Sequence, residues 1–209
     1  MSRELFPALT RPGRVHGRGE VLSRPSPVPK TAGLYAWWFR GLPPGIDTTG
    51  CLQRNGLTLL YVGISPKEPP TNGQGASKST LRQRLRTHYS GNASGSTLRL
   101  TLGCLLAAQL GITLQRVGSG GRFTFTNPGE QILDGWMAAN AFVAWQATER
   151  PWEAERELLA SGLILPLNLR DNPSTIHTSY LSGVRAAARL AALSTPVLAA
   201  SGGARRVAS

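Results

Sequence analysis

Cysteine is scarce in this sequence, and long hydrophobic runs are missing from it. The only two cysteines, Cys51 and Cys104, are too few for a disulfide framework and lack the spacing of a zinc site. No run of about eighteen apolar residues occurs, and the first residues lack the apolar core of a secretory signal. These absences argue against a disulfide-rich secreted protein and a membrane protein, and they predict a cytoplasmic one.

Acidic residues are also scarce. The chain has 23 lysines and arginines against 11 aspartates and glutamates, which gives a formal charge of +12. Between residues 64 and 129 there are eight basic residues and one acidic residue, Glu68. Most of the basic side chains are arginines, whose planar guanidinium groups suit bidentate contacts with phosphate. The clustering favours a polyanionic partner; the alternative is a basic composition shared by a whole proteome.

Two short apolar runs read as buried strands, at residues 33–39 and 58–64. Because they are neighbours in the sequence, an antiparallel pair is the simplest arrangement. A helix is predicted from Ser79 or Thr80 to Tyr89. Further elements follow: an apolar helix at 96–110, a turn at 117–121, a strand at 122–126, a short helix at 128–137, a strand at 140–147 apolar enough to be central, a helix at 151–161 and a last helix at 179–193.

The helix at 79–89 carries the first candidate functional residues. Arg84 and His88 are four residues apart, so they share one helix face. Arginine can neutralise a phosphate, and histidine can accept or relay a proton near neutral pH. Without further support, a solvent-facing side chain is the favoured interpretation of Arg84, whereas for His88 a capping or partly buried histidine is as ordinary as a proton relay.

Other candidates lie in the strands and near the C-terminus. Glu155 stands in a helix with three alternating glutamates, of which at most two can face a common site, and a helix glutamate is usually a solvated surface charge. Tyr35 and Tyr61 fit strand packing, and a phenol is a poor base unless a cation lowers its pKa. Asn168 suits a turn, a hydrogen bond to backbone, or the orientation of a site.

Taken together and in order, these motifs resemble the GIY-YIG nuclease family from about residue 31 to residue 168. Gly33-Leu34-Tyr35 and Tyr61-Val62-Gly63 resemble its two name-giving strands. The segment from Ser79 to His88 resembles its first helix, and Glu155 followed by Pro166-Leu167-Asn168 resembles its metal-binding glutamate and later asparagine. The resemblance implies an α/β fold, with a small mixed sheet around a central antiparallel pair and flanking helices. It also implies a site around one Mg²⁺ or Mn²⁺ ion held by Glu155, formed by Tyr35, Tyr61, Arg84, His88, Glu155 and Asn168.

The chain also departs from the family pattern. The two tyrosines are 26 residues apart, farther than usual in the family, so residues 41–56 are interpreted as an insertion and residues 91–147 as a longer one. Ile64 stands where some relatives carry a lysine, which leaves open which tyrosine is the base. Arg82 and Arg86 compete with Arg84, which is preferred for its spacing to His88. Glu153 likewise competes with Glu155 for the metal. The implied organisation is a basic arm at 1–30, a nuclease domain at 31–172, a C-terminal helix at 173–195 and a tail at 196–209, with both basic ends disordered.

The predicted function is metal-dependent hydrolysis of phosphodiester bonds in nucleic acid, with DNA favoured over RNA. The alternative is a nucleic-acid-binding module of the same fold without catalysis, which would not need Glu155. Residues expected to contact the nucleic-acid backbone without reading sequence are Lys78, Arg82, Arg86 and Arg99.

Overall fold

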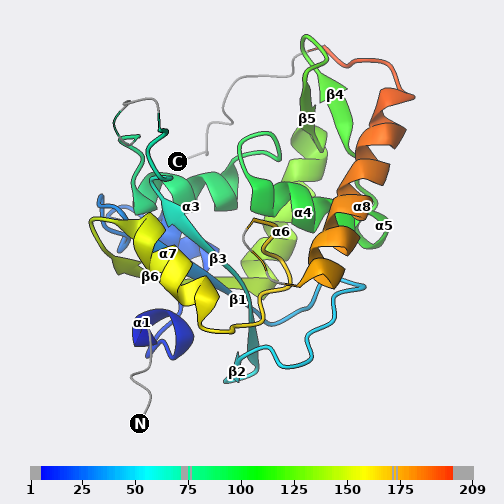
Figure 1. The fold of residues 1–209 in the computed structure, drawn as a ribbon. Helices are drawn as coiled ribbons and strands as arrows, with labels where there is room; N and C mark the ends of the chain where they lie inside the picture. The colour runs from blue at the N-terminus through cyan, green and yellow to red at the C-terminus, as the bar shows by residue number, and fades with distance from the viewer. Residues whose placement is uncertain (1–5, 72–74, 76, 171, 173, 200–209) are drawn as a thin grey trace.

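The computed structural model describes residues 6–71, 75, 77–170, 172 and 174–199. The elements follow in the order α1 (Pro7–Thr10), α2 (Arg18–Leu22), β1 (Gly33–Phe39), β2 (Gln53–Arg54), β3 (Leu57–Ser65), α3 (Leu81–Ser90), α4 (Thr97–Leu105), α5 (Ala107–Leu110), β4 (Gln115–Val117), β5 (Arg122–Thr124), α6 (Thr126–Asn140), β6 (Ala141–Ala147), α7 (Pro151–Ala160) and α8 (Thr175–Leu193), as Figure 1 shows. Within the described ranges, no helix combines the length and apolar character needed to cross a bilayer.

A four-stranded sheet with the order β2-β3-β1-β6 lies at the centre of the fold. All of its pairings are antiparallel, so the pairing predicted for the two tyrosine strands is confirmed, whereas the expected mixed sheet is instead wholly antiparallel. The α/β class with flanking helices is confirmed. The central position expected for the strand at 140–147 is wrong, because β6 lies at the edge of the sheet. It is apolar because both of its faces are covered, with Val143 in one core cluster and Phe142 packed against the other.

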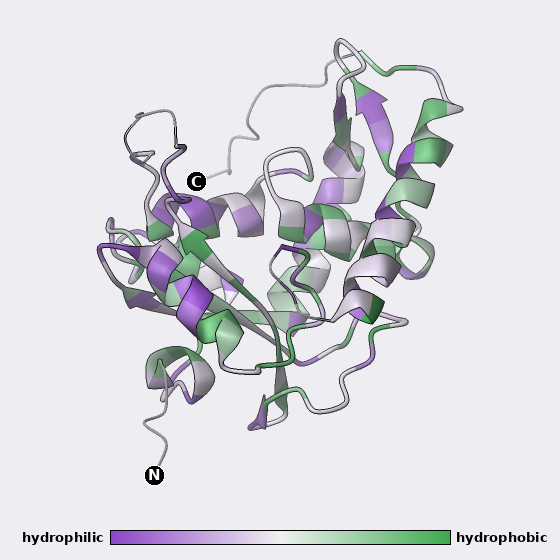
Figure 2. Ribbon diagram, in the orientation of Figure 1, coloured by the Kyte–Doolittle hydropathy of each residue, from purple (hydrophilic) through white to green (hydrophobic). Residues whose placement is uncertain are grey.

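The core has two layers, one on each face of the sheet. Alternate side chains of a strand point to opposite faces. Tyr35, Trp37 and Phe39 join the larger cluster with α3, α4 and α6, whereas Leu34 and Trp38 pack with α1 and α7. β1 is therefore buried along its whole length. Strand β3 passes between α3 and α7, and both of these helices carry strongly hydrophilic stretches (Figure 2).

The N-terminal segment packs on the domain over its described residues, so the expected disorder is wrong there. Its prolines do not prevent helix formation, because Pro7 occupies the first turn of α1, where a missing N–H costs nothing. The indole of Trp38 donates to the carbonyl of Leu9 at 3.2 Å. The backbones of His16 and Val143 exchange hydrogen bonds of 2.8 and 2.9 Å, so this segment covers the outer side of β6.

A second, two-stranded sheet forms from β4 and β5 around the predicted turn, and the strand at β4 was not predicted. The single apolar helix predicted at 96–110 is divided into α4 and α5 at Leu106. Arg116 of β4 donates to the carbonyls of Ala192, Leu193 and Thr195, so the hairpin holds the end of α8. The amide of Leu198 donates to the carbonyl of Arg116, which makes the described start of the tail part of this unit.

Candidate active site

The two motif tyrosines lie on the same face of the sheet. In the register of β1 and β3, Tyr35 lies opposite Gly63 and Trp37 lies opposite Tyr61. The two tyrosine ring centroids are 6.4 Å apart. Residue 63 must be glycine here, because a Cβ at that position would come within 2.6 Å of the Tyr35 hydroxyl oxygen. The glycine of the second motif therefore makes room for the tyrosine of the first.

Helix α3 brings Arg84 and His88 to Tyr35. Leu81 and Leu85 are fully buried and fix this helix on the sheet, so that the face carrying Arg84 and His88 turns toward the tyrosines. The Tyr35 hydroxyl oxygen lies 2.9 Å from Nε2 of His88. It also accepts a hydrogen bond of 3.3 Å from Nε of Arg84. The spacing of four residues thus places a cation and an imidazole on one phenol.

His88 continues a hydrogen-bonded chain into the core. Its Nδ1 lies 2.7 Å from the hydroxyl of Ser96, which in turn accepts the backbone amide of Arg99 as the N-cap of α4. Burial, together with the charges of Arg84 and Arg99, holds the pKa of His88 well below its usual range. The imidazole is therefore neutral near pH 7. With its proton on Nδ1, it donates to Ser96 and accepts at Nε2 from Tyr35.

Neither tyrosine is ionised near pH 7, because both pKa values are raised above the ordinary value of a phenol. Burial raises the pKa of Tyr35, and the charge of Arg84 opposes that rise only in part. The pKa of Tyr61 is raised well above its usual value by burial and by the neighbouring Tyr35. Arg84 therefore does lower the pKa of Tyr35, as a nearby cation should, but less than burial raises it. Tyr35 is the tyrosine that hydrogen-bonds directly to both Arg84 and His88.

The low pKa of His88 predicts that the protein loses stability as the pH falls below 6.5. An unfolded histidine titrates near 6.5, whereas the buried imidazole stays neutral well below that value. The unfolded state therefore binds the proton first as the pH falls. The stability that neutral, buried His88 contributes is fully present above pH 6.5 and is lost as the pH falls toward the folded pKa. We expect a loss of about 1.4 kcal/mol per pH unit in that window. The measurement is urea unfolding at about pH 7.5 and about pH 5.5. His88→Gln should remove this part of the pH dependence, and an unchanged dependence in the variant would contradict the prediction.

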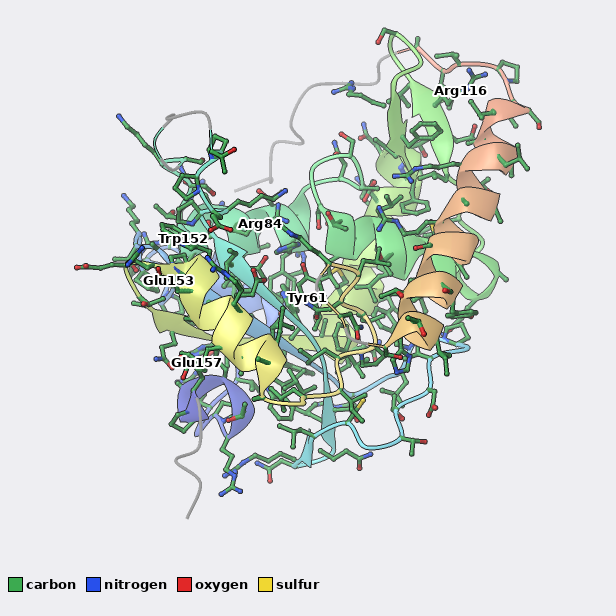
Figure 3. All side chains as sticks on the ribbon, viewed as in Figure 1. Tyr61, Arg84, Arg116, Trp152, Glu153 and Glu157 are labelled. Carbon is green, nitrogen blue, oxygen red and sulfur yellow. The ribbon has the colours of Figure 1, made fainter. Side chains whose placement is uncertain are left out.

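Helix α7 places Glu155, and neither neighbouring glutamate, at the site. Glu155 is half-buried and lines a cavity with both tyrosines, whereas Glu153 and Glu157 are exposed. Glu153 pairs with Arg150 at 2.6 Å. Figure 3 shows Glu153 and Glu157 on the side of α7 turned away from Tyr61. Side chains two positions apart point about 200° apart on a helix, and of the three glutamates only Glu155 lines the cavity.

Asn168 holds the open edge of β3. Because β2 is short, the part of β3 beyond Leu59 has no strand on that side. The backbone amide of Leu167 donates to the carbonyl of Leu60 at 3.0 Å. The side chain of Asn168 accepts from the amide of Val62 and donates to its carbonyl, both at 3.0 Å. Asn168 is therefore a positioning residue, which fixes the strand that carries Tyr61.

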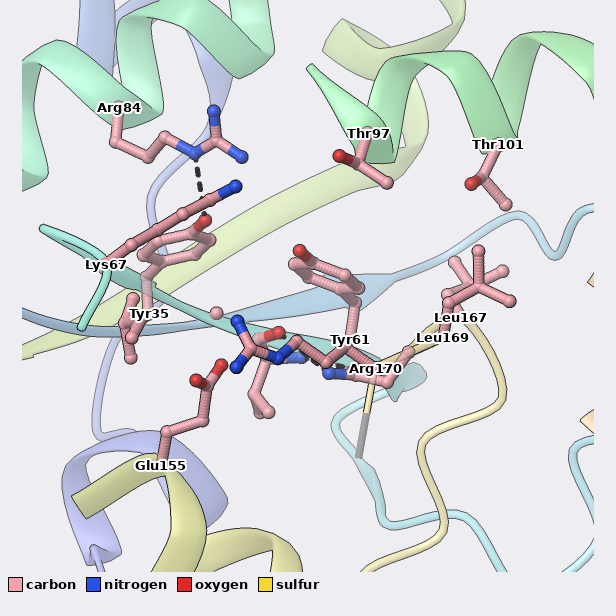
Figure 4. Close-up of a pocket in the computed structure, with 14 residues that line it drawn as sticks. Tyr35, Tyr61, Lys67, Arg84, Thr97, Thr101, Glu155, Leu167, Leu169 and Arg170 are labelled. Carbon is pink, nitrogen blue, oxygen red and sulfur yellow. Dashed lines mark hydrogen bonds between the residues drawn. The ribbon is translucent and has the colours of Figure 1, made fainter. Parts of the chain in front are cut away.

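These side chains surround a cavity of about 160 Å³ at the edge of β3. Tyr35, Tyr61 and Arg84 line one side of it and Glu155 lines another (Figure 4). The lining also contains two cations, Lys67 and Arg170, which were not among the candidates identified from the sequence. Figure 4 shows Arg170 and Glu155 pointing toward one another. Both cations stand in segments without regular periodicity, so the only signal for them was proximity to Gly63 and Asn168 in the sequence.

The arginines expected to contact nucleic acid behave differently in the structure. Arg99 is fully buried and ion-paired with Glu130 and Asp134, so its assignment to a backbone contact is wrong. Arg82 and Arg86 donate to carbonyls of the N-terminal segment, which they tie to α3. Lys78 is exposed.

The donor set of the cavity suits a single hard cation. Glu155 is its only carboxylate among the described lining residues, and the described ranges hold no group of three or more histidine, cysteine, aspartate or glutamate side chains able to form a metal cage. Mg²⁺ keeps most of its waters and commonly binds through one or two carboxylates together with substrate phosphate. The residues present therefore fit a metal ion that binds together with a phosphate.

One comparison with known proteins, that with family models, agrees with this geometry. No match was found among curated proteins or among solved structures. The family model described as the GIY-YIG catalytic domain matches residues 33–188, from β1 into α8, which is most of the chain. The proteins of that family are nucleases that act on nucleic acid. With the two tyrosine motifs, α3 and α7 all inside the matched range, the chain belongs to the GIY-YIG catalytic domain family.

Proposed function

We propose that the protein is an endonuclease that hydrolyses phosphodiester bonds of nucleic acid with the help of Mg²⁺ or Mn²⁺, and that its substrate is DNA. The observation that carries the proposal is the cavity lined by Tyr35, Tyr61, Arg84 and Glu155. Phosphodiester hydrolysis needs a base for the attacking water, positive charge at the non-bridging oxygens and a ligand for the metal. One residue of the cavity is suited to each task.

Arg84 binds the scissile phosphate in this proposal. Burial lowers the pKa of Arg84, but the interactions with Tyr35 and Tyr61 together outweigh this effect and raise the pKa above its usual value. The guanidinium therefore stays charged while the half-buried site limits screening by water. Its hydrogen bonds to Tyr35 and to the carbonyl of Gly95 fix its orientation. Such a preorganised cation stabilises the charge that develops on the phosphate oxygens in the transition state.

Tyr35 accepts the proton of the attacking water. Since its pKa is raised, the phenol transfers its own proton to Nε2 of His88 as it takes one from the water. The bond between phosphorus and the leaving oxygen then breaks, and that oxygen takes a proton from solvent. Nε2 of His88, which is unprotonated near pH 7, lies 2.9 Å from the phenol oxygen and supplies the path for this transfer. Tyr61, beside Tyr35 on the same face of the sheet, positions the water or the phosphate.

Glu155 holds the metal ion. Its carboxylate is carried by α7 to the side of the cavity across from Arg84, so a phosphate between them meets both groups (Figure 4). When bound there, the ion supplies Lewis-acid stabilisation of the phosphate and of the leaving oxygen.

Removal of the metal tests this proposal. We expect purified protein to nick or linearise supercoiled plasmid with Mg²⁺ or Mn²⁺ and to leave it intact in EDTA, because hydrolysis at this site requires the cation. Parallel reactions on single-stranded DNA and RNA test the choice of substrate. Cleavage undiminished by EDTA would contradict the metal dependence. Salt-sensitive binding without cleavage of any of these substrates would identify a binding module instead.

A further inference from the structure

A second cavity lies beside the candidate active site and is larger. Its volume is about 400 Å³, which falls within the range of about 300–1,000 Å³ typical of ligand pockets. It lies between the loop at 93–96, the start of α4, β5 and α8. Lys67, Arg84 and Thr97 line both cavities, so the two cavities adjoin. The second cavity therefore extends the surface that a bound substrate can follow.

Cations dominate the lining of this cavity. Five basic side chains and no acidic one stand among its described lining residues: Lys67, Arg84, Arg122, Arg185 and Arg189. They come from four different elements or loops, so a linear charge run in the sequence does not explain them. Like charges brought together around a concave site repel one another until an anion is bound. The arrangement is thus suited to a group with several negative oxygens.

Two arginines of α8 give independent support for an anion at this cavity. Arg185 and Arg189 are four residues apart on one helix face. Burial and the charge of Arg189 lower the pKa of Arg185. The Nε of Arg185 is buried, and among the described residues it has no hydrogen-bond partner. A buried, unsatisfied guanidinium donor beside a like charge is costly for the protein alone, and a phosphate oxygen would satisfy it.

We propose that this cavity binds a second backbone phosphate of the nucleic-acid strand whose neighbouring phosphodiester lies in the active site. The proposal rests on the nuclease function proposed above, and it assigns to Arg122, Arg185 and Arg189 the role of holding the strand. Guanidinium groups bind phosphate through paired hydrogen bonds. Phosphate contacts position a strand without reading its sequence. The shared residues Lys67 and Arg84 connect this phosphate to the one that is cut.

The test is DNA binding in EDTA, where no cleavage interferes. The variant Arg122→Gln/Arg189→Gln removes two exposed cations of the cavity and leaves the half-buried Arg185 in place. The matched control, Arg24→Gln/Arg54→Gln, removes two exposed arginines elsewhere. Fluorescence anisotropy of labelled duplex and single-stranded DNA gives the affinity over a salt series. We expect the cavity variant to bind about tenfold more weakly than the wild type. Its slope of log affinity against log salt should fall by about 0.9 on duplex DNA, or about 0.7 on a single strand, for each phosphate that the variant no longer neutralises.

Each outcome is informative. Equal affinities and slopes for the cavity variant and the control would overturn the proposal, as would absence of DNA binding by the wild type. Displacement of DNA by inorganic phosphate, beyond the effect of chloride at the same ionic strength, would instead identify a site for free phosphate and overturn the assignment to a strand. Because binding is measured without metal, a wild type that binds as expected but never cleaves would refute only the nuclease function. Cleavage with unchanged slopes would refute only the strand-binding role.

Discussion

We expect Glu155→Gln to reduce plasmid cleavage by about three orders of magnitude or more, because the metal stabilises the transition state by several kcal/mol. Glutamine keeps nearly the same shape and removes the charge that holds the cation. The carboxylate is the only one among the described residues that line the cavity, so no described neighbour in that lining replaces it. Initial rates of plasmid nicking at several Mg²⁺ concentrations measure the effect.

The matched control is Glu153→Gln. Glu153 stands on the same helix, two residues away, and its exposed carboxylate pairs with Arg150. Removing it changes the net charge by the same amount, and we expect the cleavage rate to stay close to that of the wild type. Equal losses in the two variants would show that general charge, not the metal ligand, is responsible. Full activity of Glu155→Gln would refute the assignment of the site.

We expect Glu130→Ala to destabilise the fold by about 3–5 kcal/mol, which is the usual cost of removing one partner of a buried ion pair. The Oε2 atom of Glu130 accepts from Nε and Nη2 of Arg99 at 3.0 and 2.6 Å. Its other oxygen accepts the backbone amides of Ala93 and Phe125 at 2.8 and 3.2 Å. All of these donors are buried. Alanine removes the carboxylate from Nε of Arg99 and from both backbone amides, whereas Nη2 of Arg99 keeps its bond to the carbonyl of Glu130. For a chain of this size, the melting temperature should fall by about 6–20 °C.

The control for this variant is Glu68→Ala, which breaks the exposed pair with Arg156. Surface pairs contribute about 0–1 kcal/mol, so thermal unfolding followed by circular dichroism should hardly change. A similarly small change for Glu130→Ala would mean that the fold does not depend on the buried network. Since Glu130 also fixes the loop next to Arg84, a partly folded variant should lose cleavage before it loses secondary structure.

Sequence reasoning worked where short-range spacing determines geometry. The period of two in the strands and the period of about 3.6 in α3 predicted which side chains share a face, and the family resemblance then selected Tyr35, Arg84 and His88. The choice of Glu155 over Glu153 and the role of Asn168 stayed open in the sequence, because they depend on the rotation of α7 and on the short length of β2 beside β3. These residues are brought together in the structure as the family resemblance implied.

Sequence reasoning failed where contacts between residues far apart in the sequence determine the exposure and position of a side chain. A helix arginine such as Arg99 appears exposed until its partners on α6 are known, and these partners lie more than thirty residues away. Lys67 and Arg170 carry no periodic signal, since loops follow turn chemistry and tertiary contacts. The N-terminal segment has the composition of a disordered arm, yet it buries Leu9 and Val21 completely against the domain.

Because the N-terminal segment covers β6, the folding unit is larger than the catalytic family domain. The family match begins at residue 33, but Leu9, Val21 and Val28 are completely buried before it. A fragment trimmed to the matched range would expose the hydrogen-bonding groups of β6 that His16 now satisfies. An open strand edge of this kind is a template for self-association, so solubility of a recombinant catalytic domain depends on residues that lie outside the catalytic motifs.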